Sequence, residues 1–324
     1  MNALVLKTSK GASPTTRPAL IIHGGAGYII EKNLSAEDQA AFHQALEESL
    51  NAGWALINNG ADAVDGVIAA IKVLEDCPLF DAAVGSCIAS DGSVVMSASL
   101  MDGRTLDAGG IALSKHIKNP IMAAKLAMDK SPHTLLAGSA LDEYARENHI
   151  EMEENTYFKT DLRWQQYLSV KDGDGVYLDH DLPKGTVGAV AIDCNGHIAA
   201  GTSTGGLTNQ HPARVPDSAI IGAGTYANDH VGISCTGTGD MFIKAAVAKT
   251  IANSTLSYKE AVAASLQEVI GLGGEGGLIA ITYQGEIIAD YTTAGMYHGI
   301  MHGDLDKPQT SIFITPLCVK PRNE

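Results

Sequence analysis

The sequence has little positive charge, no closely spaced cysteines and no long apolar run, and each absence excludes a class of protein. Its 324 residues include 22 Lys and Arg against 37 Asp and Glu, which gives a net charge of −15. Nucleic acid and anionic membrane surfaces would repel such a chain, so we expect neither as a partner. The sequence also lacks the signatures of RRM, zinc-finger and helix-turn-helix modules.

The cysteine pattern excludes a disulfide scaffold. The five cysteines are widely spaced and include no CxxC pair: Cys77, Cys87, Cys194, Cys235 and Cys318. An odd number at such spacing fits neither a disulfide framework nor a zinc site, and a reducing compartment suits it best. No window reaches the roughly 20 apolar residues of a membrane span. The first apolar run, Ala3–Leu6, is too short for the core of a signal peptide. We therefore expect a cytoplasmic protein.

Glycine is abundant instead, with 35 residues that cluster rather than repeat at a fixed period. Clustered glycines mark places where the backbone turns sharply or approaches a ligand. The first cluster, His23–Gly27, follows a short apolar run but lacks the G-x-G-x-x-G spacing of a dinucleotide site. His23 is a candidate catalytic residue, although a hydrogen-bonded structural histidine is the favoured interpretation at the end of a strand.

Periodicity and cap signals predict an α+β fold in a single domain, 1–324. Helices are expected over 36–58, 61–75, 120–128, 132–148, 162–168, 241–253 and 257–270. Strands are expected over 18–22, 83–89, 93–99, 186–192, 197–204, 219–221, 231–234, 278–283, 286–291 and 312–315, after a loose arm that ends at Arg17. Hairpins between pairs of helices indicate two stacked sheets with helices outside, because a doubly wound parallel sheet would need regular βαβ units.

Thr186 lies where the composition of the chain changes most sharply, from polar and charged to apolar. The polar and charged stretch of about 151–185 predicts a flexible tail, and the apolar run after Thr186 predicts a buried strand. Cleavage between Gly185 and Thr186 would create a residue that carries both a hydroxyl nucleophile and its own amine base. Such an amine has a pKa of about 7.7–8.0, so part of it is neutral near pH 7. From this run alone, a threonine that merely begins a strand is the simpler interpretation.

Three later runs contain the other groups that amide hydrolysis needs. Thr204, in the run Thr202–Gly206, is either a hydrogen-bond partner for the nucleophile or an ordinary strand residue. Arg214 and Asp217 suit the carboxylate and ammonium of an amino-acid substrate, or else form a surface ion pair. The run Thr236–Gly239 offers backbone N–H groups and a hydroxyl for an oxyanion, or else a strand-to-helix turn or anion site.

Taken together, these runs resemble the plant-type asparaginase and isoaspartyl peptidase family of N-terminal nucleophile hydrolases. The matching blocks run from His23–Gly27 through Cys77–Phe80, Met101–Gly103, Gly185–Val190 and Thr202–Gly206 to Cys235–Gly239. The resemblance implies a four-layer αββα sandwich made of two mainly antiparallel sheets. It also implies a precursor that cleaves itself into an α-subunit, 1–185, and a β-subunit, 186–324, which assemble as a dimer of αβ units.

The resemblance also implies a role for each candidate residue. Thr186 would be the nucleophile in self-cleavage and in turnover, and Thr204 would tune it. Arg214 and Asp217 would bind the α-carboxylate and the α-amine of the substrate. Thr236 and Gly237 would form the oxyanion hole and line the site, with Gly239 nearby. No cofactor is implied for catalysis. The family's structural sodium ion would be bound by backbone carbonyls of Leu74, Glu75, Cys77, Phe80, Ala82 and Val84.

Two departures from the family pattern fall near this site. Asp81 and Ala83 stand where the family usually has Asn and Gly, which adds charge and removes a permissive glycine beside the ion loop. Pro216 replaces a usual Gly and restricts the backbone between Arg214 and Asp217.

The expected activity is hydrolysis of L-asparagine and β-aspartyl dipeptides through a β-aspartyl ester on Thr186. The alternatives are a glycosylasparaginase, a slow or uncleaved precursor and a non-catalytic small-molecule-binding protein.

Overall fold

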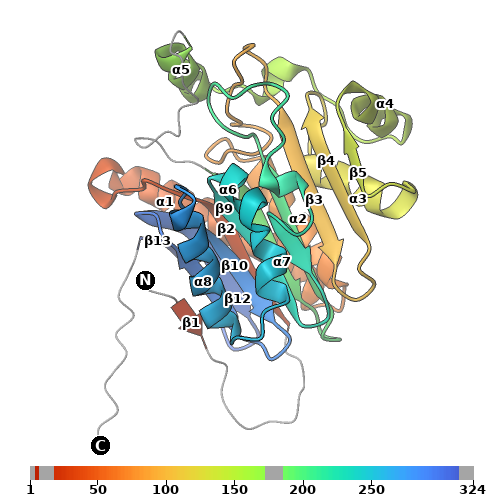
Figure 1. Cartoon of the computed structure of the whole chain (residues 1–324), viewed down its shortest axis with the longest axis vertical. Helices are drawn as coiled ribbons and strands as arrows, with labels where there is room; N and C mark the ends of the chain where they lie inside the picture. The colour runs from red at the N-terminus through yellow and green to blue at the C-terminus, as the bar shows by residue number, and fades with distance from the viewer. Residues whose placement is uncertain (1–3, 7–17, 172–184, 314–324) are drawn as a thin grey trace, which may run out of the picture.

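Two β-sheets packed face to face form the centre of the computed structural model, which describes residues 4–6, 18–171 and 185–313 (Figure 1). The five-stranded sheet has the order β1 (Leu4–Leu6), β11 (Ile287–Tyr291), β10 (Gly276–Thr282), β9 (Val231–Gly237) and β8 (Thr225–Ala227). The eight-stranded sheet has the order β13 (Gln309–Phe313), β12 (Gly295–His302), β2 (Ala19–Gly27), β6 (Val187–Ile192), β7 (Ile198–Thr204), β3 (Met96–Asp102), β4 (Ala108–Ser114) and β5 (Leu135–Ala137). The paired strands run antiparallel except β4 and β5, which are parallel.

Helices cover the outer face of each sheet. The eight-stranded sheet carries α1 (Ala36–Ile57), α2 (Ala63–Glu75) and α3 (Pro120–Lys130). The five-stranded sheet carries α6 (Gly239–Ala245), α7 (Val247–Ala252) and α8 (Tyr258–Gly271). The layers therefore follow the order helices, sheet, sheet, helices, and the predicted αββα sandwich is confirmed (Figure 1).

Strand β2 shows how the core is divided. Its nine residues are all buried, and apart from His23 they are apolar or small, so the strand lacks the usual alternation of polar and apolar side chains. Leu20 and Ile22 face the helices, whereas Ile21 faces the second sheet. This alternation is the two-residue period of a strand that is covered on both faces.

Local signals explain the helices that the sequence predicted well. Ser35 caps α1 by accepting a 3.0 Å hydrogen bond from the Asp38 amide, and the Asp38 carboxylate accepts one from the Ser35 amide. This reciprocal capping box satisfies two N–H groups that the first turn leaves unpaired. Pro120 begins α3 at the position where a helix does not need an N–H donor.

Several predicted boundaries were wrong because single residues adopt left-handed backbone. The helix expected over 241–253 is divided at Ala246, which has a φ of 46° and separates α6 from α7. The helix expected over 132–148 begins only at Ser139, after Gly138 at a φ of 74°, as α4 (Ser139–Glu147). Residues 135–137 pair with β4 instead.

The predicted strand assignments also need correction. The hairpin expected over 83–99 keeps its turn at Gly92 but is reduced to one bridge, between Ile88 and Val94, and the regular strand begins at Met96. Residues 219–221 form no regular strand: Ala219 ends a 3-10 turn, Asp217–Ala219, and Ile221 makes one isolated bridge to Thr225. Strands β4, β8 and β12 were not predicted, and β1 lies inside the arm expected to be loose.

The first part of the stretch expected to be a flexible tail packs on the domain. It contains a 3-10 turn, Asn155–Phe158, and α5 (Asp161–Val170), which includes the predicted helix 162–168. Phe158 is fully buried against Ile88 and Val94. The chain is therefore folded onto the domain up to residue 171, and the part of the expected tail at residues 172–184 lies outside the described part of the chain.

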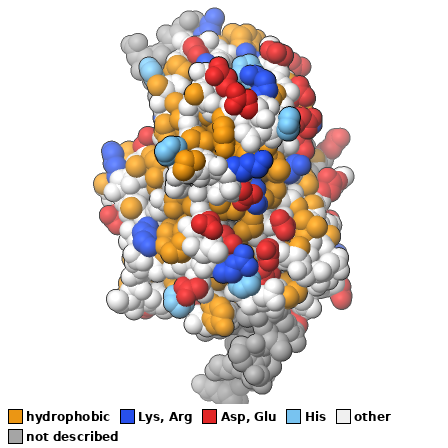
Figure 2. Space-filling model, turned by 90° about the vertical axis from the view of Figure 1, so that its right-hand side faces the viewer, with side chains coloured by type: hydrophobic (Ala, Val, Ile, Leu, Met, Phe, Trp, Pro, Cys, Tyr) orange, Lys and Arg blue, Asp and Glu red, His pale blue; other side chains and the backbone are white. Residues whose placement is uncertain are grey.

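On the face shown in Figure 2, basic side chains are scattered among acidic ones rather than gathered into one patch. None of the described helices is long and apolar enough to cross a membrane. The four cysteines in the described ranges are free thiols.

Candidate active site

Thr186 lies at the start of β6, directly opposite the end of β7. The antiparallel register pairs Val187 with Ser203, which places Thr186 beside Thr204. The Thr186 hydroxyl donates a 3.1 Å hydrogen bond to Oγ1 of Thr204, and the Gly206 amide donates to the same oxygen at 3.1 Å. The predicted nucleophile and its predicted partner are therefore in contact, with the backbone of the next loop fixing the partner.

The carbonyl of the peptide bond before Thr186 accepts a hydrogen bond from the backbone. The Asp81 amide donates to the Gly185 carbonyl oxygen at 3.2 Å. Gly185 itself is buried against the backbone of β2, where a Cβ atom would lie 2.3 Å from the Gly24 carbonyl oxygen. Only glycine fits at this position without a shift of backbone.

His23 binds the carbonyl on the other side of Thr186. It is fully buried, and burial lowers its pKa to about 3, so the ring is neutral. Because a carbonyl can only accept, Nδ1 carries the proton and donates to the Thr186 oxygen at 3.0 Å. Nε2 then accepts from the Ser234 hydroxyl at 3.0 Å. His23 is therefore a hydrogen-bonded residue of the packed interior, as favoured, and its partner is the backbone of the predicted nucleophile.

Gly188 makes room for that histidine. A Cβ atom built on Gly188 would lie 2.4 Å from Nε2 of His23 and 2.0 Å from Oγ of Ser234. Both side chains are fully buried, so neither can move aside freely. The glycine two residues after Thr186 is thus required by packing between the two sheets.

Arg214 and Asp217 do not pair with each other. Within the described ranges no hydrogen bond or ion pair joins them, and Oδ2 of Asp217 is buried without a partner. Arg214 instead donates from Nε and Nη2 to Oδ2 of Asp240 at 3.1 and 3.0 Å, and from Nη1 to Oε1 of Gln210 at 3.0 Å. The surface-pair alternative is wrong, and no local pattern in the sequence indicated Asp240 or Gln210 as partners of Arg214.

Asp217 is a buried acid with an altered pKa. Its side chain is 3% exposed, and burial raises its pKa to about 7 although the Arg214 charge acts in the opposite direction. A buried carboxylate oxygen without a partner favours a cationic ligand. Pro216 adopts an extended backbone with a φ of −77°, so this position needs no left-handed glycine.

The predicted oxyanion run lies next to these residues. The Ala26 amide donates to Oγ1 of Thr236 at 3.2 Å. Gly237 has a φ of 142°, and a Cβ atom there would lie 2.4 Å from the Glu275 carbonyl oxygen. A Cβ atom on Gly239 would lie 2.3 Å from Oδ1 of Asp217, so Gly239 gives that carboxylate its place.

The predicted ion loop is only partly free to bind a cation. The carbonyls of Leu74, Glu75 and Cys77 accept hydrogen bonds from backbone amides at 3.0–3.3 Å. The carbonyls of Phe80, Ala82 and Val84 accept none from the described residues. Three carbonyl oxygens in one buried loop are suitable ligands for a hard monovalent ion.

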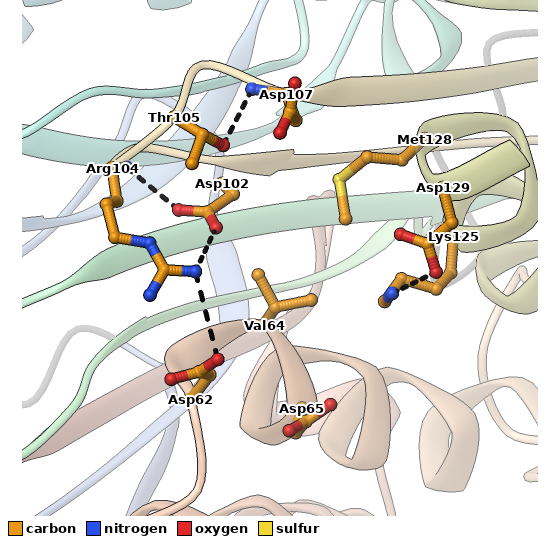
Figure 3. Close-up of a pocket in the computed structure, with 10 residues that line it drawn as sticks. All are labelled: Asp62, Val64, Asp65, Asp102, Arg104, Thr105, Asp107, Lys125, Met128 and Asp129. Carbon is orange, nitrogen blue, oxygen red and sulfur yellow. Dashed lines mark hydrogen bonds and ion pairs between the residues drawn. The ribbon is translucent and has the colours of Figure 1, made fainter. Parts of the chain in front are cut away.

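A cavity of about 540 Å³ lies away from the predicted site (Figure 3). Arg104 pairs there with Asp102 and Asp62, and Lys125 pairs with Asp129. Asp62 lies near Asp193. Asp193 follows the last residue of β6, whereas Thr186 precedes the first residue of the same strand. Six strand residues separate the two ends, about 20 Å at 3.3 Å per residue. This acidic cavity therefore does not contain the predicted nucleophile.

A comparison with protein families agrees with the resemblance inferred from the sequence. A family model described as "Asparaginase" matches residues 16–310, which is most of the chain. The chain belongs to the asparaginase family. Among similar proteins is the isoaspartyl peptidase of Escherichia coli K12, 39% identical over 310 residues that cover 92% of this chain and 96% of that one.

Two further relatives of this asparaginase family member come from distant organisms. A probable isoaspartyl peptidase/L-asparaginase 2 of Arabidopsis thaliana is 36% identical over an alignment that covers 87% of this chain and 94% of the relative. A plant-type L-asparaginase of Pyrococcus abyssi is 36% identical and covers 91% of this chain and 99% of its own.

Proposed function

We propose that this protein is a self-cleaving threonine hydrolase that acts on L-asparagine and β-aspartyl dipeptides. One observation supports this function above the others. The hydroxyl of Thr186 contacts Thr204, while the carbonyl of the bond before Thr186 accepts a hydrogen bond from Asp81. A nucleophile and a polarised carbonyl thus meet at one peptide bond, which is the arrangement that self-cleavage needs.

In self-cleavage, Oγ1 of Thr186 attacks the carbonyl carbon of Gly185. The C–N bond breaks, the nitrogen takes up a proton, and an ester joins Gly185 to the threonine oxygen. Water then hydrolyses this ester, which leaves a carboxylate on Gly185 and a free amine on Thr186. The subunits would be residues 1–185 and 186–324.

In turnover, the new amine of Thr186 serves as the base for the hydroxyl of the same residue. The oxygen attacks the side-chain carbonyl of the substrate, and ammonia or an amino acid leaves with the proton. Water cleaves the resulting β-aspartyl ester and releases aspartate. The hydrogen bond with Thr204 keeps the attacking oxygen in one orientation, and orientation lowers the barrier by reducing the entropy lost in the transition state.

The surrounding groups would bind and polarise the substrate. Arg214 would bind the α-carboxylate and Asp217 the α-ammonium, because each offers an opposite charge in a water-poor site. Thr236 and the backbone of Gly237 would donate to the oxyanion, with Gly239 lining the same space. Donors that are already oriented typically contribute about 3 kcal/mol each to lowering the barrier.

A structural sodium ion would be bound by carbonyls of the loop after α2, chiefly Phe80, Ala82 and Val84. The ion would stabilise the loop that places the Asp81 amide against Gly185. Replacing NaCl by tetramethylammonium chloride at equal ionic strength should then lower the melting temperature. An unchanged melting temperature would contradict the ion site.

The decisive assay compares three substrates on the incubated, purified protein. We expect release of aspartate from L-asparagine and from β-Asp-Leu, and none from a glycosylated asparagine. The variant Thr186→Ala should remain one chain and release nothing. Activity on the sugar-linked substrate alone would favour a glycosylasparaginase, and binding without turnover would favour a binding protein. The dimer of αβ units and the cytoplasmic location stay predictions.

A further inference from the structure

The guanidinium of Arg214 is fixed on two flanks by residues outside its own sequence run. Oδ2 of Asp240, in the first turn of α6, accepts hydrogen bonds from Nε and Nη2. Oε1 of Gln210 accepts one from Nη1, and the same oxygen also accepts from the Leu207 amide at 3.1 Å. Gln210 is 2% exposed, so this second acceptor is part of the packed interior.

The carboxylate of Asp217 lies close to this guanidinium and yet is not paired with it. A Cβ atom built on Gly239 would lie 2.3 Å from Oδ1 of Asp217 and 3.1 Å from Nη2 of Arg214. Both charged groups therefore pack against the same glycine. Oδ2 of Asp217 has no hydrogen-bond partner within the described part of the chain.

Two opposite charges this close in a buried site attract each other strongly. A free Arg214 would therefore turn towards Asp217, because a side chain with four rotatable bonds loses little by moving over so short a distance. The hydrogen bonds to Asp240 oppose that movement, since they already compensate the guanidinium charge. Asp240 is half exposed and its partner is not, so the pair sits at the rim of the site.

We propose that Asp240, together with Gln210, keeps Arg214 away from Asp217 and so leaves Asp217 free to bind the ammonium group of the substrate. This inference rests on the proposed function, in which Arg214 and Asp217 bind the two charges of an amino acid. Asp240 is then a positioning residue that prevents the empty site from closing on itself. Nη1 and Nη2 of Arg214 each retain one N–H for the carboxylate of the substrate.

The charges around Asp217 make the proposed role of Asp240 visible in the pH dependence of ligand binding. The groups that act on Asp217 are Arg214, which lowers its pKa, and Asp240, which raises it, while Asp217 itself raises the pKa of buried Cys235. Loss of the Asp240 charge and pairing with Arg214 both lower the pKa of Asp217. Ligand binding that needs ionised Asp217 should therefore set in at lower pH in a variant without Asp240.

The test compares Asp240→Ala with Asp240→Glu and with the control Asp229→Asn, which removes an exposed acid that lies 3.6 Å from Nε2 of His230. The readouts are kcat and KM for L-asparagine, and the affinity for L-aspartate measured by calorimetry between pH 5.5 and 8.5. For Asp240→Ala we expect KM and the dissociation constant to rise about tenfold at pH 8, equivalent to about 1.4 kcal/mol. We expect kcat to stay within about twofold, because the reacting groups are untouched.

The binding transition of Asp240→Ala should also move to lower pH, Asp240→Glu should restore the parent values, and Asp229→Asn should match the parent. An unchanged or lower KM in Asp240→Ala would overturn the proposal, as would an unmoved pH transition or a failure of self-cleavage. If the parent releases no aspartate from asparagine or from β-Asp-Leu, the proposed function itself fails. If the parent is active and Asp240→Ala equals it, only the role of Asp240 fails.

Discussion

The Asp81 amide donates a hydrogen bond to the carbonyl oxygen of Gly185, with 3.2 Å between nitrogen and oxygen. This contact joins the loop after α2 to the bond that we propose is cleaved. The attack of Thr186 places negative charge on that oxygen, and a backbone donor already in place stabilises the charge as it develops. The contribution comes from the backbone, so it does not depend on the side chain at residue 81.

Asp81→Asn should therefore preserve self-cleavage and raise stability. Oδ1 of Asp81 accepts from the Cys87 amide at 2.7 Å, and an Asn oxygen can do the same. Burial raises the pKa of Asp81 above its ordinary value of 3.8, so the folded state binds more protons than the unfolded state just above that pH. The free energy of unfolding therefore falls as the pH rises above 3.8 and Asp81 ionises. Asp81→Asn avoids this loss because its side chain does not ionise.

Thermal unfolding of both proteins between pH 4 and 8 measures this effect. The gain in melting temperature should be largest at pH 8 and should shrink towards pH 4. A variant that is less stable at pH 8, or that no longer cleaves itself, would contradict the account.

Thr204→Ala should slow both reactions of Thr186. The change removes the oxygen that accepts from the Thr186 hydroxyl and leaves the Gly206 amide unpaired. We expect kcat to fall about 100-fold, within the usual range for a group that assists the nucleophile. Thr204→Ser should restore most of the rate. The control is Thr208→Ala, in the loop that follows Thr204, because the Thr208 hydroxyl donates to Sγ of Cys87. Equal losses of activity in both alanine variants would argue for a general effect on this loop.

Gly188→Ala should disrupt the histidine behind the nucleophile. The added methyl would lie 2.0 Å from Oγ of Ser234, and buried side chains in a packed interior do not yield that much space. We expect self-cleavage to be lost, with a lower melting temperature. Gly271→Ala, at the end of α8, should leave both unchanged, because beyond its chain neighbours and its own helix the described chain has no atom within 4 Å of the added Cβ.

His23 should contribute no titration to activity. Its pKa of about 3 keeps the ring neutral at any pH above about 4. A kcat profile of the processed enzyme between pH 5 and 9 should therefore show the amine of Thr186, at about 7.7–8.0 for an ordinary α-amine, and no step near 6.5. A step at 6.5 that disappears in His23→Asn would contradict the neutral histidine.

Ala83→Gly should stabilise the loop after α2, where the sodium ion is proposed to bind. Ala83 has a φ of 44°, a left-handed conformation that costs a residue with a Cβ atom about 1 kcal/mol relative to glycine. Glycine also raises the entropy of the unfolded chain, so we expect a net gain of about 0.5 kcal/mol. Ala82→Gly, next to it and without a positive φ, should destabilise instead. Denaturant unfolding of the two variants distinguishes the signs.

The sequence predicted the layers because their signals are local. The caps of α1 and the break after Gly60 lie within a few residues of the helix they delimit. Strand β4 was missed for the opposite reason. Glycine usually weakens a strand, but a Cβ atom on Gly109 would lie 2.0 Å from the Ala124 carbonyl oxygen, so the close approach of α3 requires glycine in this strand.

The site divides in the same way. Thr186 and Thr204 could be predicted as partners because two consecutive strands bring them together. Asp240 could not be predicted as the partner of Arg214, because 26 residues and a change of sheet separate them. A contact of that kind depends on how α6 packs beside the 3-10 turn at Asp217, and no local pattern encodes it.

The most direct test of the account is the N-terminal sequence of the smaller fragment after incubation of the purified protein, read together with its intact mass. We expect two chains, one of which begins Thr-Val-Gly-Ala at Thr186, and a single intact chain for Thr186→Ala. A parent protein that stays at full length, or a fragment that begins at any other residue, would contradict it.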